Sequence, residues 1–372
     1  MPKLIFQLNK IIFVGNARDF HAIDWYRTIK RICVNQEVIF ATDLIYSEGH
    51  SKIVDQNDNI KDLYNIDRFL LDRQSSFGNV WRNLIKLLFF PVQVIALKKI
   101  AKGNPDAVYH AHTMYYLFIC WLAGIRYIGS PQGDEILIRP YKSSLYKYFA
   151  KQSLAAAEHL IVDSVNLQNG IRKLCGKEAE VIQYGIDVGG IQKALSNTNE
   201  RDKVISIRAW YPLYRIKEII STRNNCMPDQ GLVFFFPFWE DGYKKEIEDS
   251  IKSIDINLGR LPTKEELYNV LVSGRLAISI PESDSSPRSV YESIFCGCCV
   301  AVSYNLWIES LPACMRQRVY VVSLEDNDWF EKAVEHSFKV IQEPYIPSEE
   351  ALNMFDQERS MKKVAIQYYG HN

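Results

Sequence analysis

The stretch of sequence with the clearest chemical potential is residues 281–303, PESDSSPRSVYESIFCGCCVAVS, which joins two short apolar runs. Ser286 and Pro287 predict a helix start, because serine caps helices and proline suits the first helical position. Gly297 stands where the helix should stop. The spacing therefore predicts a short helix over about residues 287–296, entered through an acidic, serine-rich turn.

The polar face of this helix has the residue types of a site for an anion and a diol. Arg288, Ser289 and Glu292 share that face by three-and-four spacing. The amides of Arg288 and Ser289 would open the positive end of the helix dipole, where phosphate is the usual ligand. Arg288 adds a charge that grips two oxygens, and Glu292, one turn deeper, would accept hydrogen bonds from vicinal hydroxyls. The pattern indicates a nucleotide diphosphate and its ribose. The alternative is an i,i+4 surface pair worth roughly 0.3 kcal/mol.

The cysteines next to this helix predict packing rather than chemistry. Cys296, Cys298 and Cys299 lack a second ligand pair and flank the entry to an apolar run, so we expect small buried residues and no metal. The chain has eight cysteines in 372 residues without a framework spacing, which suits a reducing cytoplasm.

The elements that must position these residues alternate between strands and helices. Compact, β-branched apolar runs recur between helix-length amphipathic segments, which predicts parallel sheets with helices on both faces. The expected fold class is α/β, with two doubly wound Rossmann-like domains facing across a cleft, and the functional groups at the carboxyl ends of the strands. The expected strands are 10–15, 37–42, 106–113, 126–133, 159–164, 180–185, 203–210, 232–238, 276–281, 299–304 and 319–324.

A polar, turn-rich segment, LSNTNERDK at 195–203, interrupts the alternation of strands and helices. Its composition predicts a linker between two domains. We therefore expect an N-terminal domain over 1–197 and a C-terminal, nucleotide-binding domain over 198–346. The charged helical tail, 347–372, is expected to pack back on the N-terminal domain.

The composition describes a globular protein: 47% of residues are hydrophobic and 24% are charged. Lysine plus arginine equals aspartate plus glutamate at 44 each, which argues against a dedicated nucleic-acid binder. The first residues lack the pattern of a signal peptide, and no uncharged apolar run reaches the roughly 18 residues of a membrane span. A cytoplasmic protein is expected.

Residues 81–103, WRNLIKLLFFPVQVIALKKIAKG, stand apart because they are strongly apolar, carry only basic charges and contain Pro91. One interpretation is a helix drawn to the anionic inner face of the cytoplasmic membrane. The other is a proline-kinked core helix. The two are compatible.

The motif around Glu292 resembles that of the retaining glycosyltransferases of the GT-B fold, the family-4 group. Glu292 matches the second glutamate of the family's E-x7-E motif, Gly297 its glycine, and Asp284 falls on the first glutamate. The resemblance implies that Asp284 lies by the transferred sugar or its nucleotide and that Glu292 binds the ribose. Ser285, Arg288 and Ser289 are expected at the diphosphate.

A second segment, VISIRAWYPLYRIKEIIS, resembles the family's arginine–lysine motif at the opening of the second domain. Arg208 matches the arginine, and either Lys217 or Arg215 the lysine. In the family these cations hold the donor diphosphate and its departing charge, which fixed cations stabilise without a metal or cofactor.

In the first domain, DAVYHAHT and GSPQGDEIL resemble family motifs, but Gln132 stands where the family has histidine. A glutamine donates a hydrogen bond and does not titrate, so a general base at that position is in doubt. His112, at the end of an expected strand, is the nearest titratable alternative, or else a packed core residue.

The resemblance implies a cytoplasmic, metal-independent enzyme that moves a sugar from a nucleotide-diphosphate donor to a hydroxyl with retention of configuration. The acceptor would be a glycan or lipid-linked molecule, in bacterial surface polysaccharide or lipopolysaccharide assembly. The alternatives are a nucleotide-sugar epimerase, a phosphorylase, or a non-catalytic carbohydrate-binding subunit of the same fold. An NAD enzyme is disfavoured, because G-x-G-x-x-G does not follow the first strand.

Overall fold

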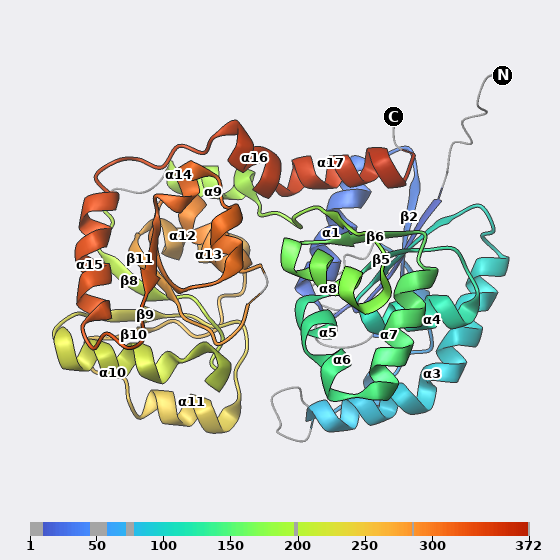
Figure 1. Ribbon diagram of the computed structural model, residues 1–372, viewed down its shortest axis with the longest axis horizontal. Helices are drawn as coiled ribbons and strands as arrows, with labels where there is room; N and C mark the ends of the chain where they lie inside the picture. Colours follow the sequence, from blue (N-terminus) through green and yellow to red (C-terminus); the bar gives the residue numbers. More distant parts are fainter. Residues whose placement is uncertain (1–9, 45–57, 72–77, 197–199, 285, 371–372) are drawn as a thin grey trace. The chain divides into compact units, whose positions relative to one another are not determined.

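The computed structural model describes residues 10–44, 58–71, 78–196, 200–284 and 286–370, and the chain divides into two compact units. Unit 1 holds the described residues up to Tyr184 together with those from Gln357 onward, and unit 2 holds Gly185–Asp356. Each unit is a parallel sheet covered by helices (Figure 1).

The described strands of unit 1 form a seven-stranded sheet in the order β3-β2-β1-β4-β5-β6-β7. The buried faces of β1 alternate, because Ile12 and Val14 belong to one core and Ile11 and Phe13 to the other. Helices α3, α4, α7 and α8 cover the first core, and α1 and α17 cover the second. The strands are β1 Lys10–Val14, β2 Glu37–Thr42, β3 Asn59–Asp62, β4 Val108–His112, β5 Ile128–Ser130, β6 His159–Val162 and β7 Glu180–Val181.

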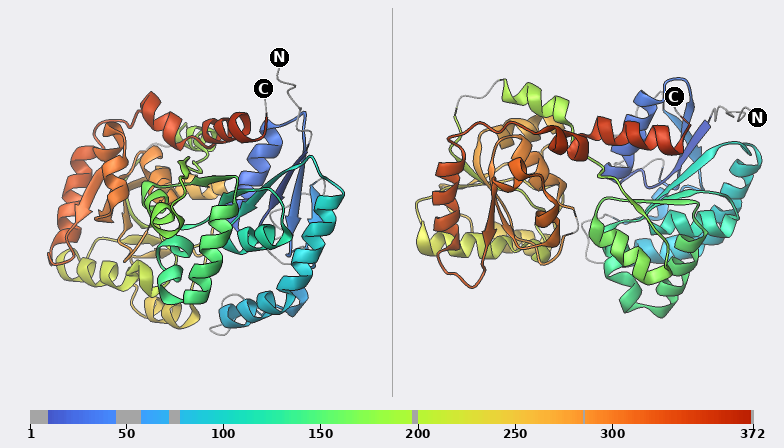
Figure 2. Two further views of the ribbon diagram at one scale, coloured as in Figure 1. Left: turned by 45° about the vertical axis from the view of Figure 1, so that its right-hand side comes forward. Right: turned by 45° about the horizontal axis from the view of Figure 1, so that its top comes forward.

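The helices of unit 1 follow these strands in the manner of a doubly wound fold. They are α1 Phe20–Ile32, α3 Gly78–Lys102, α4 Met114–Ala123, α5 Gly133–Leu137, α6 Arg139–Lys142, α7 Ser144–Ala156, α8 Val165–Cys175 and α17 Gln357–Tyr368, with the 3-10 turn η1 Asp67–Phe69. Helix α3 continues through Pro91. Helix α17 lies against α1 although the two are far apart in sequence (Figure 2).

The described strands of unit 2 form a six-stranded sheet in the order β10-β9-β8-β11-β12-β13. Helices α9, α12, α13 and α16 cover one face, and α10, α11 and α15 cover the other. The strands are β8 Lys203–Ser206, β9 Leu232–Phe234, β10 Ile256–Asn257, β11 Gly274–Ser279, β12 Cys299–Ser303 and β13 Val319–Val322.

The helices of unit 2 are α9 Val188–Leu195, α10 Ile216–Cys226, α11 Asp241–Glu248, α12 Lys264–Val272, α13 Arg288–Phe295, α14 Ala313–Arg316, α15 Trp329–Val340 and α16 Glu349–Phe355, with the 3-10 turns η2 Pro212–Tyr214 and η3 Leu306–Ser310. The unit begins at Gly185, ahead of the polar segment 195–203, because α9 packs its Val188, Ile191 and Ala194 into the unit 2 core. The tail expected as one piece is also divided: α16 belongs to unit 2 and α17 to unit 1.

Both sheets reverse their strand order at one place, between β1 and β4 in unit 1 and between β8 and β11 in unit 2. In open α/β sheets, ligands bind outside the carboxyl ends of the strands at such a switch point. The topology therefore singles out the segments that follow β1 and β4, and those that follow β8 and β11. Among the described residues, no helix is long and apolar enough to cross a bilayer.

Candidate functional site

The switch point of unit 2 brings together Arg208, two residues after β8, and Asp284, five residues after β11. Arg208 Nη2 lies 2.6 Å from Asp284 Oδ2, and Arg208 Nη1 donates to Ser289 Oγ at 3.2 Å. The two side chains are 11% and 14% exposed, and the guanidinium lies over the ring of Tyr214, 4.4 Å from its centroid. Three residues named from the sequence thus meet at one partly buried point.

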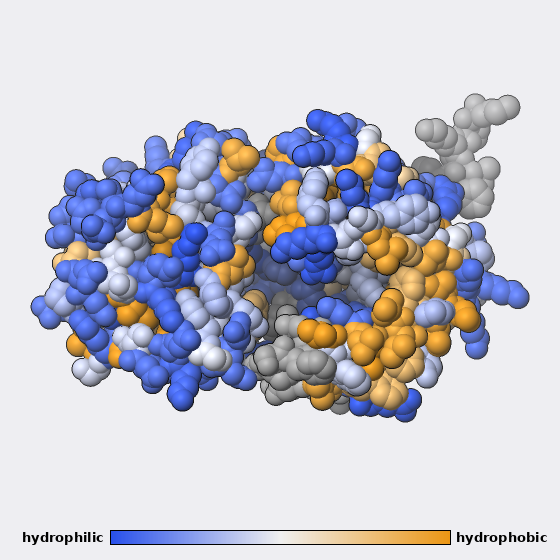
Figure 3. All heavy atoms as spheres, turned by 60° about the horizontal axis from the view of Figure 1, so that its bottom comes forward, coloured by the Kyte–Doolittle hydropathy of each residue, from blue (hydrophilic) through white to orange (hydrophobic). Residues whose placement is uncertain are grey.

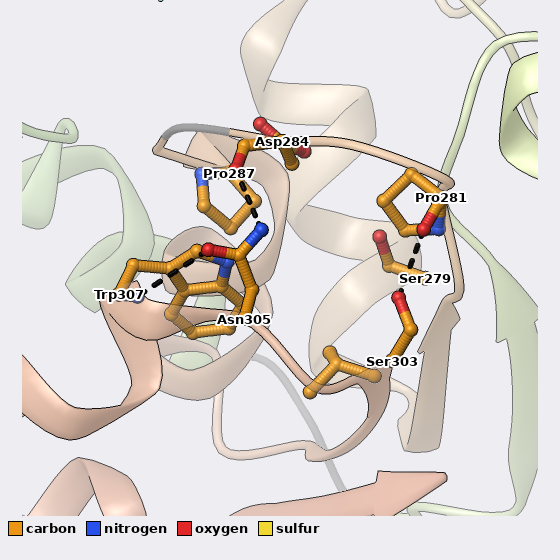
Figure 4. A pocket seen from close by; sticks show the side chains of 8 residues that line it. Ser279, Pro281, Asp284, Pro287, Ser303, Asn305 and Trp307 are labelled. Atoms are coloured by element: carbon orange, nitrogen blue, oxygen red, sulfur yellow. Dashed lines mark hydrogen bonds between the residues drawn. The ribbon is translucent and has the colours of Figure 1, made fainter. Parts of the chain in front are cut away.

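The turn that carries Asp284 is fixed from the neighbouring strand, β12. Ser303 Oγ donates to the carbonyl of Pro281 at 2.9 Å, and Asn305 Nδ2 donates to the carbonyl of Asp284 at 2.7 Å. Figure 4 shows these bonds around a small hollow at the ends of β11 and β12, with Trp307 and Pro287 among its walls. The backbone of Asp284 is therefore held in place independently of its carboxylate. Ser285, the next residue, lies outside the described residues.

Helix α13 begins one residue later than the sequence suggested. Pro287 is the N-cap residue, with a ψ of 86° that is not helical, so Ser286 is not the cap and the first helical residue is Arg288. Among the described residues, no side chain caps this helix start. The predicted stop at Gly297 is confirmed, because its φ of +90° is a conformation that favours glycine.

Glu292 lies one turn into α13 and is buried, so its pair with Arg288 is not the solvated surface contact that the sequence also allowed. Arg288 Nε lies 3.4 Å from Glu292 Oε1, and Tyr268 of α12 donates its hydroxyl to the same oxygen at 3.4 Å. Burial, reinforced by the charge of Glu292, raises the pKa of Tyr268 far above its ordinary value. Tyr268 was not named from the sequence, because strand β11 separates its helix, α12, from α13 along the chain.

The two candidate cations after Arg208 lie in different surroundings. Arg215 has a φ of +51° and donates Nη1 to the carbonyl of Ile280 at 3.4 Å, at the end of β11. Lys217 is exposed and forms an ion pair with Glu246 of α11. The structure therefore brings Arg215, rather than Lys217, to the strand that leads to Asp284.

The switch point of unit 1 carries its own polar group, centred on Asp19. Asp19 caps α1 by accepting the amide of His21 at 3.0 Å, and its other oxygen accepts Gln132 Nε2 at 3.0 Å. His112 Nδ1 lies 3.6 Å from that second oxygen. Asp19 follows β1, His112 ends β4 and Gln132 follows β5, so the group is assembled from three neighbouring strands.

His112 has the environment of a buried residue. Its side chain is fully buried against the rings of Phe13, Trp25 and Tyr184, and its ring nitrogens have no hydrogen-bond partner among the described residues. Burial lowers the pKa of His112 to about 4, although the charge of Asp19 acts in the opposite direction. The imidazole is therefore neutral near pH 7 and does not reach the surface.

Glu135 was not named from the sequence and holds this group together. One of its carboxylate oxygens accepts the amides of Gln132 at 3.0 Å and of Met114 at 2.9 Å. It thereby ties the segment after β5 to Met114 at the start of α4. The residue before Met114, Thr113, has a φ of +74°, which is unusual for a residue with a side chain. Burial raises the pKa of Glu135 to about 7. The capping-box spacing Q-x-x-E was visible in the sequence and was the signal that could have identified it.

The cysteines after α13 lie in the core. Cys296, Cys298 and Cys299 are all buried, and burial raises the pKa of the Cys298 and Cys299 thiols to about 12. This burial agrees with the packing role that the sequence predicted for them.

No family model matches the chain, and no curated protein matches it in sequence. Solved structures match it in fold. HepE of Anabaena in complex with UDP-glucose aligns with a TM-score of 0.70 at 13% identity, over 96% of this chain and 98% of HepE. Sucrose-phosphate synthase from Thermosynechococcus elongatus gives a TM-score of 0.69 at 11% identity, over 97% and 98% of the two chains.

A putative UDP-N-acetylglucosamine 2-epimerase from Listeria monocytogenes also aligns, with a TM-score of 0.61 at 9% identity over 97% and 96% of the two chains. The structural neighbours include GT-B glycosyltransferases as well as this epimerase. With two parallel, doubly wound sheets matched over nearly the whole length, the chain has the α/β GT-B fold that the sequence predicted.

Proposed function

We propose that this chain is a nucleotide-sugar-dependent glycosyltransferase whose donor is held by unit 2. The observation that carries the proposal is the meeting of Arg208, Asp284 and Ser289 at the switch point between β8 and β11, beside the start of α13. Cations and the first amides of a helix are the features that bind a diphosphate. The structural neighbour HepE has been solved with UDP and with UDP-glucose, which supports a ligand of this kind.

Within the proposed site, each group has a role that its chemistry suits. Arg208, Arg288 and the first amides of α13 hold the diphosphate, with Arg215 preferred over Lys217 as the further cation. Glu292 accepts hydrogen bonds from the ribose hydroxyls, oriented by Tyr268. Asp284 accepts hydrogen bonds from the transferred sugar. The cations stabilise the charge that develops on the departing diphosphate, and no metal is required.

The acceptor is assigned to unit 1, at the switch point occupied by Asp19 and Gln132. Asp19 is the group there that accepts hydrogen bonds from a hydroxyl, and Gln132 keeps it in place through the 3.0 Å bond. His112 is assigned a positioning role beneath Asp19, because its side chain is fully buried. Transfer with retention follows from the family-4 resemblance: the acceptor attacks on the face that the diphosphate leaves, and the departing phosphate takes the acceptor's proton.

The surface of α3 supports a lipid-linked acceptor. Leu87, Leu88 and Ile95 are 69%, 63% and 66% exposed. The helix carries five basic residues and no acidic ones. Lys86 points inward and pairs with Asp43 at 3.3 Å, whereas Lys98, Lys99 and Lys102 are exposed. Figure 3 shows hydrophobic side chains gathered over the part of unit 1 where α3 lies. An apolar ridge with only basic charge suits an anionic lipid surface. The function proposed is glycan assembly for a bacterial surface polysaccharide or lipopolysaccharide, at the cytoplasmic face of the membrane.

The lipid contact is tested by sedimentation with phosphatidylglycerol and phosphatidylcholine vesicles. We expect binding to the anionic vesicles, reduced at least about tenfold when Leu87, Leu88 and Ile95 are all changed to serine. The matched control is Val34→Ser, because Val34 is 74% exposed outside α3. Equal sedimentation of the triple variant and the control contradicts the assignment.

The enzymatic proposal is tested with a panel of nucleotide sugars, glycan acceptors and lipid-linked acceptors, with the product configuration read by NMR. Transfer from one donor with retention supports it. The fold shared with the Listeria epimerase makes epimerisation the second candidate, which a changed sugar in the recovered donor would reveal. Tight nucleotide binding without turnover would instead indicate a non-catalytic binding subunit.

A further inference from the structure

The cation at the centre of the proposed donor site is already bound to a carboxylate of its own chain. Arg208 donates Nη2 to Asp284 Oδ2 at 2.6 Å and Nη1 to Ser289 Oγ at 3.2 Å. The ring of Tyr214 lies over the face of the guanidinium. A diphosphate at the start of α13 must therefore either displace the Asp284 carboxylate or lie beside it. Both the phosphate and the carboxylate are anions, and at this partly buried point their repulsion is poorly screened.

The attachment of the turn allows the carboxylate to leave without unfolding the loop. The backbone at Asp284 is held by Asn305, and the start of the turn is held by Ser303. Both of these bonds are accepted by backbone carbonyls, so neither has to break when the Asp284 carboxylate leaves Arg208. The released carboxylate then needs new hydrogen-bond donors, because a partly buried carboxylate without a partner is unfavourable.

A nucleotide sugar brings such donors and a free nucleoside diphosphate does not. The sugar hydroxyls attached to the second phosphate would lie next to the released carboxylate and donate to it. We propose that Asp284 is the specificity residue that favours a nucleotide sugar over a free nucleoside diphosphate, by competing with the diphosphate for Arg208 until sugar hydroxyls replace that contact. The inference rests on the proposed function. Its consequence is that the product diphosphate, once it has lost the sugar, is bound more weakly than the donor.

The test is calorimetric titration of wild type and Asp284→Asn with UDP, GDP, inorganic pyrophosphate, UDP-glucose and GDP-mannose. Asparagine keeps the shape of the side chain and removes the competing charge. We expect the variant to bind the diphosphates and pyrophosphate about tenfold more tightly, since the ion pair no longer opposes them. Affinity for the sugar-bearing ligand should change less than about threefold, so that the preference for the nucleotide sugar largely disappears.

The matched control is Glu282→Gln, which removes an exposed carboxylate from the same turn and should leave every affinity unchanged. Asp284→Ser is the second variant, for use if Asp284→Asn is unstable. It should bind the diphosphates more tightly than wild type in the same way. Diphosphates that bind Asp284→Asn no more tightly than wild type overturn the inference alone. If neither protein binds any of the five ligands, the proposed function fails as well.

Discussion

Replacement of Glu292 tests the proposed ribose contact most directly. Its carboxylate lies between Arg288 Nε and the Tyr268 hydroxyl, each at 3.4 Å, and is buried one turn into α13. Both contacts are long for strong hydrogen bonds, so the oxygens keep capacity to accept from a diol. Glu292→Gln keeps the shape and removes the charge, whereas Glu292→Ala removes both.

The expected loss of binding free energy follows from the number of hydrogen bonds that Glu292 accepts from the ribose. A hydrogen bond to a charged group contributes about 1.5 kcal/mol at the low end, so two ribose contacts amount to about 3 kcal/mol. Loss of both in Glu292→Ala should weaken nucleoside diphosphate binding roughly a hundredfold. Glu292→Gln should weaken it about tenfold, because neutral hydrogen bonds are about half as strong as charged ones. Leaving Arg288 without its carboxylate should also lower the free energy of unfolding by about 1–3 kcal/mol.

The assay compares UDP with 2′-deoxyuridine diphosphate by calorimetry, and GDP with its deoxy form. Wild type should prefer the ribose form by about tenfold, and Glu292→Ala should bind both forms equally. Circular dichroism establishes that each variant is folded. Glu266→Gln, an exposed carboxylate on α12, is the matched control and should bind like wild type.

Two results would refute the reasoning. One is a folded Glu292→Ala protein that binds nucleoside diphosphates as well as wild type does. The other is a variant whose affinity falls while its preference for ribose over deoxyribose is unchanged. The second result would mean that the loss came through Arg288 and not through a contact with the sugar ring.

Three further outcomes are expected. Arg215→Ala should weaken pyrophosphate binding about tenfold and Lys217→Ala should leave it within twofold, as measured by calorimetry, because only Arg215 reaches the end of β11. Burial raises the pKa of Glu135 to about 7 in the folded protein, above its unfolded value, so the free energy of unfolding should fall as the pH rises from about 4.5 to 7. Glu135→Gln should therefore raise the melting temperature at pH 8 and not at pH 4. Asp255→Asn should lower the free energy of unfolding in urea by about 3–5 kcal/mol, because Asp255 forms a fully buried ion pair with Arg223 at 2.7 Å. The double variant Asp255→Leu with Arg223→Met should lower it by less, because it leaves no buried charge without a partner.

Much of the unit 2 site could be predicted from local sequence. The pattern around α13 has a helix-compatible start, a polar face and a glycine stop, and each of these depends only on residues within one or two turns of each other. The strands before and after α13, β11 and β12, could also be predicted, because buried parallel strands are continuous apolar runs. The error at Ser286 is of the same local kind: a proline with a non-helical ψ took the capping position that a serine was expected to fill.

The partners of those residues could not be predicted in the same way. Arg208 and Asp284 are separated by 76 positions and meet only because β8 and β11 are neighbours in the sheet. Asp19, His112 and Gln132 come together because β1, β4 and β5 are consecutive in their sheet. Strand order is decided by how whole helices pack, which no short motif encodes.

The sequence by itself determined the fold class, the elements and which residue types stand at strand ends. Only the tertiary structure decided that Arg208 is bound to Asp284, that His112 is enclosed by aromatic rings and that Arg215 rather than Lys217 reaches β11. The physical reason is that secondary structure follows from periodicity within one segment, whereas burial and charge pairing depend on which segments the sheet places side by side.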